Sequence, residues 1–409
     1  MTRTARRIAG ASRPERLVLH LVIALLILPS SLAFAQLPAY LQVGSRLTWD
    51  GGGSSLQGSR LVPDPNGWIW QNEQWNRVEG TYGGGGVGLI QIDILSAGPE
   101  GIVGDVRSYL NTDLQSGVYA LSGVDAVVGD QNGLSTYWVA PARLAGLQTG
   151  WDGMTRVWRG PRVINGAQYD TVSIATLAQG SYSSNTYDVA TGLLLFGGTM
   201  DAQPGVMATD PNGTVVFQNQ GAVSYSHQLF LGVRQLQVPW AGRPAPDWAA
   251  PGLTLVYQGQ SRAELGGGGG LPPLPGSAMA ISYAFTQRVG GALLGYQVSQ
   301  LATTQGLPPD QVTLARAFGS AAMDGLWVAP DVLGRLQAGQ VIDQDPFTGM
   351  QTYFGGVQNG GAVVVYQGRG DMLENYYDPN SGFLVYTRYR KQAANVGFQV
   401  NELWYTGTQ

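Results

Sequence analysis

The sequence predicts an all-β protein built as a tandem duplication of two antiparallel β domains, each a half-barrel, barrel or sandwich with one or two short helices. Three observations predict this fold class. Turn-forming pairs such as Asn-Gly, Asp-Gly and Asp-Pro recur along the chain, which has 60 glycines and 22 prolines among its 409 residues. Short runs rich in β-branched and aromatic residues lie between these turns, as is typical of antiparallel strands. A long pattern also occurs twice.

The repeated pattern begins at residues 138–141 (W-V-A-P) and recurs 189 residues later at 327–330. Both copies continue as W-V-A-P-x-x-L-x-x-L-Q-x-G and reach a Y-D-x-x-[ST]-G motif, at residues 187–192 and 377–382. A repeat of this length has the size of a domain, not of a solenoid unit. Nearer the N-terminus the copies align at an offset of 208, which predicts about 19 extra residues in the first copy, around Gln57 to Gly80. The pairs aligned there are Gly44 with Gly252, Leu47 with Leu255, and Trp49 with Tyr257.

The Y-D-x-x-[ST]-G motif predicts a β-hairpin in each copy. In the second copy, Asp378 can accept hydrogen bonds from backbone N–H groups two and three residues on, and Pro379 presets φ near −65°. Gly382 can take the left-handed conformation that closes the turn, and Gly192 holds the same position in the first copy. Aromatic and aliphatic runs leave the turn on both sides, as the two strands of a hairpin require.

Helix is expected only in short pieces. Pro141 to Leu147 and Pro330 to Leu336 each place a proline in the first turn and leucines at i and i+3, with a glycine three residues after the second leucine. Pro309 to Phe318 is expected to add a third short helix.

Residues 1–35 have the features of a secretory signal peptide. Five arginines precede an apolar run from Leu17 to Leu28, and Ala33-Phe34-Ala35 fits the small-x-small cleavage rule. The alternative is a membrane anchor, but a run of twelve residues before Pro29, eleven of them apolar, is too short to cross a hydrocarbon core of about 30 Å. We therefore expect an exported protein that is periplasmic, on the cell surface or extracellular, without a transmembrane segment in the mature chain.

Charge and cysteine content narrow the function classes. The five arginines and one glutamate of the signal segment leave 18 basic and 26 acidic residues, a formal charge of −8, in the mature chain. Phosphate binding needs a basic stripe and none is visible, so a nucleic-acid role is disfavoured. The absence of cysteine excludes a disulfide framework and thiolate chemistry.

The predicted domain organisation follows from the repeat and from one proline-rich segment. After the signal peptide (1–35) we expect a first β repeat domain at 36–238, a linker at 239–251 with four prolines, and a second β repeat domain at 252–409. A proline-rich stretch of this kind is a semi-rigid connector. Each repeat is therefore expected to fold by itself.

The W-x-x-P helix followed by meandering strands and the Y-D-x-x-[ST]-G hairpin resembles a unit of uncharacterised exported bacterial β-proteins. More distantly it resembles the open half-barrels of periplasmic lipoprotein carriers of the LolA type. The resemblance covers some fifty to sixty residues of each half. It implies a concave apolar sheet face that can hold an acyl chain, and it assigns no functional residue.

Catalytic signatures are few, and we assign no catalytic residue, metal ligand or cofactor. His227 is the one histidine outside the signal segment, it lies in a strand-like run, and no G-x-S-x-G elbow accompanies it. A carboxylate pair of the glycosidase kind is the remaining catalytic option, although no spacing pairs the candidates. The candidate carboxylates are Glu73, Glu79, Asp93, Glu374 and Glu402.

Two sets of residues are candidate ligand contacts. The extra segment of the first copy contains Trp68, Trp70 and Trp75. Exposed indoles there could stack on a sugar or dock a protein. The alternative is that Trp68 and Trp70, two residues apart, pack on the core. The second set comprises the aliphatic and aromatic residues that follow the two hairpins, at the expected inner face. These residues are Leu193, Leu195, Phe383 and Val385. Trp138 and Trp327 occur in both copies and are expected to be core anchors.

These observations favour an exported non-enzymatic binding or cell-surface assembly protein that holds an apolar or amphipathic ligand. The alternative is a carbohydrate-binding module or glycan-active enzyme that uses the tryptophan-rich segment. A lipid, a glycan and a surface protein are the partners considered. Enzymatic activity is not decided by the sequence, although the lack of a nucleophile–base pair favours binding.

Overall fold

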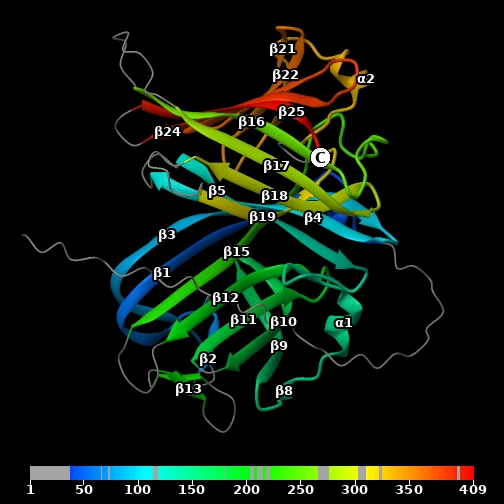
Figure 1. The fold of residues 1–409 in the computed structure, drawn as a ribbon. Coiled ribbons are helices and arrows are strands. Elements are labelled where there is room, and N and C mark those ends of the chain that lie inside the picture. Colours follow the sequence, from blue (N-terminus) through cyan, green and yellow to red (C-terminus); the bar gives the residue numbers. More distant parts are fainter. Residues whose placement is uncertain are drawn as a thin grey trace, which may run out of the picture. The chain divides into compact units, whose positions relative to one another are not determined.

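The computed structural model of the chain describes most of the sequence after the first 36 residues. The described ranges are 37–65, 67–71, 74–113, 118–178, 180–202, 207–209, 215–217, 222–265, 276–302, 310–321, 325–393 and 397–409. The predicted signal peptide, Glu73 and the glycine-rich stretch 266–270 lie outside the described residues. The protein is all-β, and every pair of strands in its sheets is antiparallel (Figure 1).

Thirteen of the described strands form the first sheet, in the order β7-β6-β5-β4-β3-β1-β15-β12-β11-β10-β9-β8, with β2 paired to β3. Its strands are β1 (Ser45–Pro63), β2 (Ile69–Gln71), β3 (Gln74–Gly98), β4 (Gly101–Asp113), β5 (Val118–Asp130), β6 (Gly133–Leu134), β7 (Trp138–Val139), β8 (Gly150–Trp151), β9 (Thr155–Ile164), β10 (Ala167–Ala178), β11 (Ser181–Asp188), β12 (Leu194–Ala202) and β15 (Val223–Gln235). A small separate pair joins β13 (Met207–Thr209) to β14 (Val215–Phe217).

Ten of the described strands form the second sheet, in the order β19-β18-β17-β16-β25-β24-β23-β22-β21-β20. Its strands are β16 (Thr254–Leu265), β17 (Ser277–Val289), β18 (Ala292–Leu301), β19 (Asp310–Phe318), β20 (Val341–Gln344), β21 (Gln351–Gln358), β22 (Gly361–Gln367), β23 (Asp371–Tyr377), β24 (Leu384–Ala393) and β25 (Gly397–Thr408). The helical elements of the described chain are η1 (Ala39–Leu41), α1 (Pro141–Gly146) and α2 (Pro330–Leu333).

The predicted duplication is confirmed by the strand order. The path β5-β4-β3-β1-β15-β12-β11-β10-β9-β8 of the first sheet matches the path of the second sheet strand for strand. Side chains repeat the same bonds: Trp49 Nε1 donates to the Leu194 carbonyl at 2.9 Å, and its counterpart Tyr257 donates through its hydroxyl to the Leu384 carbonyl at 2.8 Å. Each bond fastens the first strand of a copy to the strand after the hairpin.

The two hairpins form as predicted. Gly382 has φ +69° and donates its N–H to the Asp378 carbonyl at 2.7 Å, and Gly192 has φ +78°. A Cβ atom built on Gly382 would lie 1.8 Å from the Val328 carbonyl oxygen. The glycine therefore serves two purposes, because it supplies the left-handed conformation and lets the turn lie against the W-V-A-P segment. Trp138 and Trp327 are 2% and 4% exposed, as expected of core anchors.

The expected third helix at Pro309 to Phe318 is wrong. Residues 310–318 form β19, the edge strand of the second sheet, paired with β18. The physical reason is the period of the sequence, since Leu314, Arg316 and Phe318 alternate along one face of an extended strand. A proline near the start of a segment does not distinguish a helix from an edge strand.

The extra residues of the first copy form β2 and lengthen β1 and β3. Trp68, just before β2, is 5% exposed and packs against Tyr182 and the backbone of Gly198, where a Cβ atom would lie 2.9 Å from the indole. Gly198 pairs with Ser184 on β11, and the equivalent pair in the second sheet is Arg388 with Glu374. The face of the first sheet that the insert covers is therefore the face that carries ion pairs in the second sheet.

The proline-rich segment 239–251 is packed against the core of the second sheet. Trp240 and Ala249 are 1% and 0% exposed and belong to the same hydrophobic cluster as Leu255 and Phe354. That cluster also includes Leu89 and Tyr109 of the first sheet. The division into two independent domains remains a prediction.

Candidate functional site

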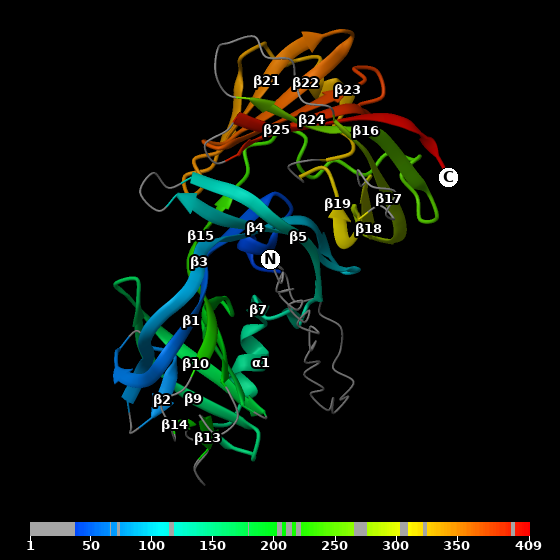
Figure 2. The same cartoon turned by 60° about the vertical axis from the view of Figure 1, so that its left-hand side comes forward.

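A cavity of about 330 Å³ lies between the second sheet and the hairpin formed by β4 and β5. Strands β4 and β5 contact β19, the edge strand of the second sheet, and the three lie side by side in both views (Figures 1 and 2). Side chains of β17, β18, β19 and β22 to β25 form the remaining walls. The volume is at the lower end of the range found for small-molecule pockets.

The apolar lining of this cavity is incompletely covered by protein. Leu121, Met279, Leu314 and Leu373 line it and stay partly exposed, although each lies on an inward-facing position of its strand. Along one row of the sheet, Met279 and Leu403 flank Gly259, whose backbone approaches β25 so closely that a Cβ atom would lie 1.7 Å from the Glu402 carbonyl oxygen. Gly259 therefore places no side chain between Met279 and Leu403.

Two buried arginines form the polar wall on the side of β4 and β19. Arg107 and Arg316 are 1% and 3% exposed, and both approach Asp105, with N–O distances of 2.7 and 3.7 Å. Arg316 also donates to the Gln297 side chain at 2.6 Å. Asp105 is fully buried and is not among the residues that line the cavity. The carboxylate therefore holds the two guanidinium groups from behind.

The opposite polar wall is made by β23, β24 and β25. The Tyr389 hydroxyl donates to Asp371 at 3.3 Å, and the Thr387 hydroxyl donates to the Asn375 side chain at 2.7 Å. Burial raises the pKa of the Asp371 carboxyl, although Tyr389 acts in the other direction. The side-chain oxygen of Asn401 is buried in this wall and has no hydrogen-bond partner among the described residues.

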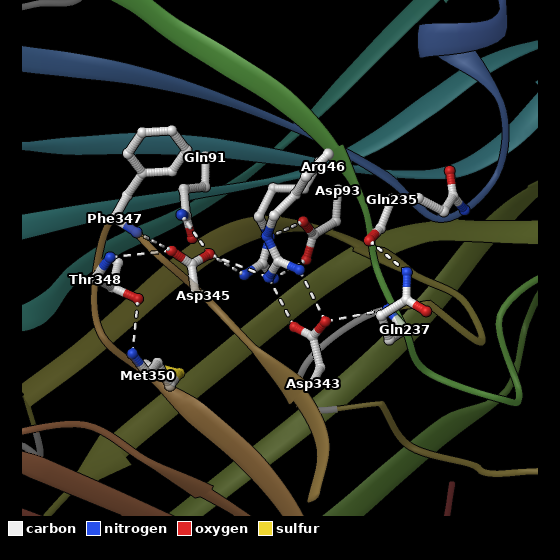
Figure 3. A network of polar contacts seen from close by, with 11 residues as sticks. Arg46, Gln91, Asp93, Gln235, Gln237, Asp343, Asp345, Phe347, Thr348 and Met350 are labelled. Atoms are coloured by element: carbon white, nitrogen blue, oxygen red, sulfur yellow. Dashed lines mark hydrogen bonds and ion pairs between the residues drawn. The ribbon is translucent and has the colours of Figure 1, made fainter.

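A buried ion-pair cluster lies beside the cavity and joins the two sheets (Figure 3). Its charged members are Arg46, Asp93, Arg234, Asp343 and Asp345. Arg46 binds both oxygens of Asp93 at 2.6 and 2.7 Å and reaches Asp345 at 2.7 Å. Arg234 binds both oxygens of Asp343 at 2.8 and 2.7 Å. Strands β1, β3 and β15 thus hold the end of β20 and the turn after it.

The electrostatics of this cluster favour its ionised form. Burial alone would raise the pKa of Asp345, but the charge of Arg46 and the N–H of Thr348 outweigh it and hold that pKa well below its usual range. Burial alone would lower the pKa of Arg46, yet Asp93 and Asp345 raise it above its usual value. Asp345 also accepts a hydrogen bond from Gln91 at 2.8 Å.

The turn held by this cluster reaches the cavity. Asp345 accepts the N–H groups of Phe347 and Thr348 at 2.9 and 3.0 Å, and the Thr348 hydroxyl accepts the N–H of Met350 at 3.2 Å. The Met350 side chain lines the cavity. One wall of the cavity is therefore positioned by the contact between the two sheets.

Within the described ranges, no three His, Cys, Asp or Glu side chains gather in a way that could hold a metal ion. His227 is half-buried beside Tyr225, and its pKa is lowered by burial. Among the helices that the structure describes, none is long and apolar enough to span a membrane.

The candidate carboxylates are placed as members of ion pairs. Asp93 belongs to the buried cluster, and Glu79 pairs with exposed arginines on β1 and β3. Glu374 and Glu402 approach Arg388 at 3.6 and 3.5 Å on the face of the second sheet that points away from the cavity.

The tryptophans of the insert contact one another and the first sheet. Trp70 and Trp75 pack edge to face at 5.1 Å, and Trp75 lies 5.7 Å from Trp158. The Arg162 guanidinium lies 3.9 Å from the centre of the Trp75 ring. Trp70 and Trp75 are partly exposed, whereas Trp68 is buried. Their predicted role in ligand binding remains a prediction.

The hairpin residues lie in packed surroundings outside the cavity lining. Leu193 and Leu195 are 6% and 2% exposed and belong to two clusters of the first sheet. Phe383 packs against Trp248 at 5.1 Å, and Val385 is partly buried on β24. Leu384, between these two, does line the cavity. A ligand role for Leu193, Leu195, Phe383 and Val385 also remains a prediction.

The residues that define the cavity were missed by sequence reasoning. Arg107 and Arg316 follow the alternation of their strands, and an arginine at an inward position is the signal that could have drawn attention to each. Asp345 caps a turn through the N–H of Thr348, but its bond to Arg46 joins residues 299 positions apart. Such a pairing has no local signature.

Comparisons with known proteins give no family for the chain. No protein-family model matches it, and no curated protein matches it. Among solved structures, MucB in complex with MucA(peri) aligns at 11% identity over 87% of each chain, with a TM-score of 0.18. The Pseudomonas aeruginosa MucA/MucB complex aligns at 10% identity over 89% of each chain, with a TM-score of 0.19. Pseudomonas aeruginosa OpdL aligns at 11% identity over 90% of this chain and 98% of that chain, with a TM-score of 0.12. TM-scores this low carry no argument about fold or function.

Proposed function

We propose that the protein is an exported, non-enzymatic binding protein that holds a small apolar or amphipathic ligand in the cavity between the second sheet and the β4–β5 hairpin. The observation that carries this proposal is the incomplete cover of inward-facing aliphatic side chains around about 330 Å³. A sheet of this size can fill its own interior, as the clusters of the first sheet do. In the second sheet, the cavity-lining residues Met279 and Leu403 lie on either side of Gly259, which adds no side chain between them.

The energy available suits reversible binding. Covering about 300 Å² of apolar surface at about 25 cal/mol per Å² gives roughly 7 kcal/mol before the costs of association and ordering. Those costs remove several kcal/mol, so we expect weak binding, with dissociation constants near the millimolar range. Binding of this strength is readily reversible.

The experiment fills the cavity from within. Met279→Trp should abolish the fluorescence gain of a neutral hydrophobic dye such as N-phenyl-1-naphthylamine, because the larger side chain occupies the space beside Leu403. Val357→Trp is the matched control, since Val357 is 66% exposed on β21 and is not among the cavity-lining residues. Native mass spectrometry of the protein purified from its host then shows whether a ligand co-purifies. Unchanged dye binding in Met279→Trp would refute the proposal.

Export and a resemblance to LolA-type half-barrels belong to the same proposal. Export is supported by residues 1–35, and N-terminal sequencing of the mature protein tests it, since cleavage after Ala35 is expected. The likeness to a half-barrel is supported by the aliphatic side chains that line the cavity on one face of the second sheet. A lipid is the partner that such a face would favour.

Glycan binding by the insert is the second candidate, and it has less support. Trp68 is buried, and Trp75 contacts Arg162 and Trp158. Trp70 keeps partial exposure, so Trp70→Ala tests this candidate directly. Loss of binding to a glycan array in this variant, with dye uptake unchanged, would favour the glycan.

A further inference from the structure

We infer that the face of the second sheet turned away from the cavity binds a neutral polysaccharide chain, with Trp404 as the residue that stacks on a sugar ring. This surface is separate from the cavity, since Trp404 is not among the lining residues. The inference therefore stands or falls independently of the proposed function.

An aromatic row crosses three neighbouring strands on this face. Trp404 on β25 is paired with Tyr386 on β24, which is paired with Tyr376 on β23. Their successive ring centres are 5.0 and 4.9 Å apart. Leu403 lines the cavity, so the alternation of side chains along β25 places Trp404 on the opposite face. Two strand spacings are about 10 Å, so the row is longer than one sugar ring and suits a chain.

The indole at the end of this row is open to a ligand. Tyr386 flanks Trp404 on one side, and the residue paired with it on the other side is Gln258 of β16. The next residue in the same row is Ala280 of β17, whose side chain is a single methyl group. Trp404 is accordingly 45% exposed. Its ring offers a flat apolar surface that the C–H groups of a sugar ring can cover.

Hydrogen-bonding groups are held in place beside the indole. Glu402 lies two residues before Trp404 and therefore on the same face. It accepts a hydrogen bond from the Tyr386 hydroxyl at 3.0 Å, and it forms ion pairs with Arg262 and Arg388. These contacts order the side chains before a ligand arrives, which lowers the cost of binding. A sugar hydroxyl both donates and accepts, so it suits a surface where carboxylates and guanidinium groups lie next to one another.

The charges on this face compensate one another. In the part of β16 and of β23 to β25 that the structure describes, three arginines and three glutamates lie on this face, and each belongs to an ion pair. They are Arg262, Arg388, Arg390, Glu264, Glu374 and Glu402. Nucleic acids and anionic membranes need a basic surface, and the centres of protein interfaces are poor in charged residues. A neutral chain rich in hydroxyl groups is the partner class that matches this composition.

The first copy uses the same face differently. Phe196 and Leu229 are paired there as Tyr386 and Trp404 are paired in the second sheet. Both pack in the hydrophobic cluster that contains Trp68 of the insert. The second copy lacks the insert, so its aromatic row has no such cover. The face that is apolar and covered in the first copy is thus aromatic, polar and open in the second.

The test is native gel electrophoresis of the full mature protein in gels that contain one soluble polysaccharide, with binding measured as loss of mobility. The neutral probes are laminarin, hydroxyethyl cellulose, galactomannan and dextran, and polygalacturonate is the acidic comparison. We expect at least one neutral probe to retard the protein. Trp404→Ala should weaken that binding about tenfold, because it removes the stacking surface, while Trp404→Phe should retain most of it. Tyr82→Ala is the matched control, since Tyr82 is an aromatic residue of the first sheet that is 63% exposed.

The results that would overturn the inference are specific. They are no retardation by any neutral probe, retardation by polygalacturonate alone, or full retention of binding in Trp404→Ala. Binding that is lost in Trp70→Ala and kept in Trp404→Ala would place the glycan on the insert instead. A dimer in light scattering that Trp404→Ala dissociates would make this face an interface between two copies of the chain. None of these results depends on dye binding in the cavity, so the proposed function is tested separately.

Discussion

Replacing Arg46 by Met should destabilise the protein by about 4 kcal/mol, because it leaves two buried carboxylates without their main partner. Arg46 makes three charged hydrogen bonds of 2.6 to 2.7 Å, two to Asp93 and one to Asp345. Arg46 is 2% exposed, and both carboxylates are 1% exposed. Removing one member of a buried ion pair costs about 3 to 5 kcal/mol, since the remaining charge keeps its desolvation penalty. Asp345 retains Gln91 and Arg234, which argues for a value inside that range.

The assay is equilibrium unfolding in urea at pH 7, followed by tryptophan fluorescence. Arg243→Met is the matched control, because it removes an arginine of the Arg243–Asp331 pair, whose side chains are 50% and 46% exposed. Exposed pairs of this kind contribute about 0 to 1 kcal/mol. If Arg46→Met and Arg243→Met differ by less than about 1 kcal/mol, the reasoning about burial is wrong.

Three further predictions follow from the same structure. Gly382→Ala should lower the free energy of unfolding several times more than Gly360→Ala. Both positions have positive φ, but an added Cβ atom meets the Val328 carbonyl only at Gly382. The midpoints of urea unfolding of the two variants test this. Trp68→Ala should lower the free energy of unfolding by about 3 to 5 kcal/mol and leave dye binding unchanged, because Trp68 is buried and does not line the cavity. A stable variant that loses dye binding would contradict this. Asp345 has a lowered pKa in the folded state, so its contribution to stability is complete above the unfolded value of about 4 and is lost as pH falls through the folded value; thermal melts should therefore show less acid destabilisation in Arg46→Met than in the unmodified protein.

The fold was largely predictable because its signals are local or repeated. The hairpins depend on Asp378 and Gly382, which act within five residues of chain, and the duplication follows from matching residues at a fixed offset. The error at 310–318 has the opposite cause. A proline at the start of the segment suits a short helix, but pairing with β18 makes it a strand, and that partner is not part of the segment.

The candidate site was less predictable because its parts come from both copies. Arg107 belongs to β4 of the first sheet and Arg316 to β19 of the second, and Asp105 is what joins them. A single sequence shows the strand to which each residue belongs, but not which strands of different sheets face each other. The tryptophans of the insert attracted attention by composition, whereas the residues that line the cavity are spread over β4, β5 and the strands of the second sheet and form no pattern in the sequence.

The contact between the turn after β20 and the first sheet is of a kind that could be repeated between molecules. Asp345 docks on the first sheet through Arg46. Asp152, which follows the corresponding strand β8 of the first copy, also accepts the N–H groups two and three residues on, those of Met154 and Thr155, although its turn is shorter. A head-to-tail contact between identical repeats has no natural end and produces filaments when both surfaces stay complementary. Here the position equivalent to Arg46 is Thr254, so the second copy offers no cation to the exposed Asp152 of another molecule. Because the two copies have diverged, this contact forms once, within one molecule, and is not repeated from one molecule to the next.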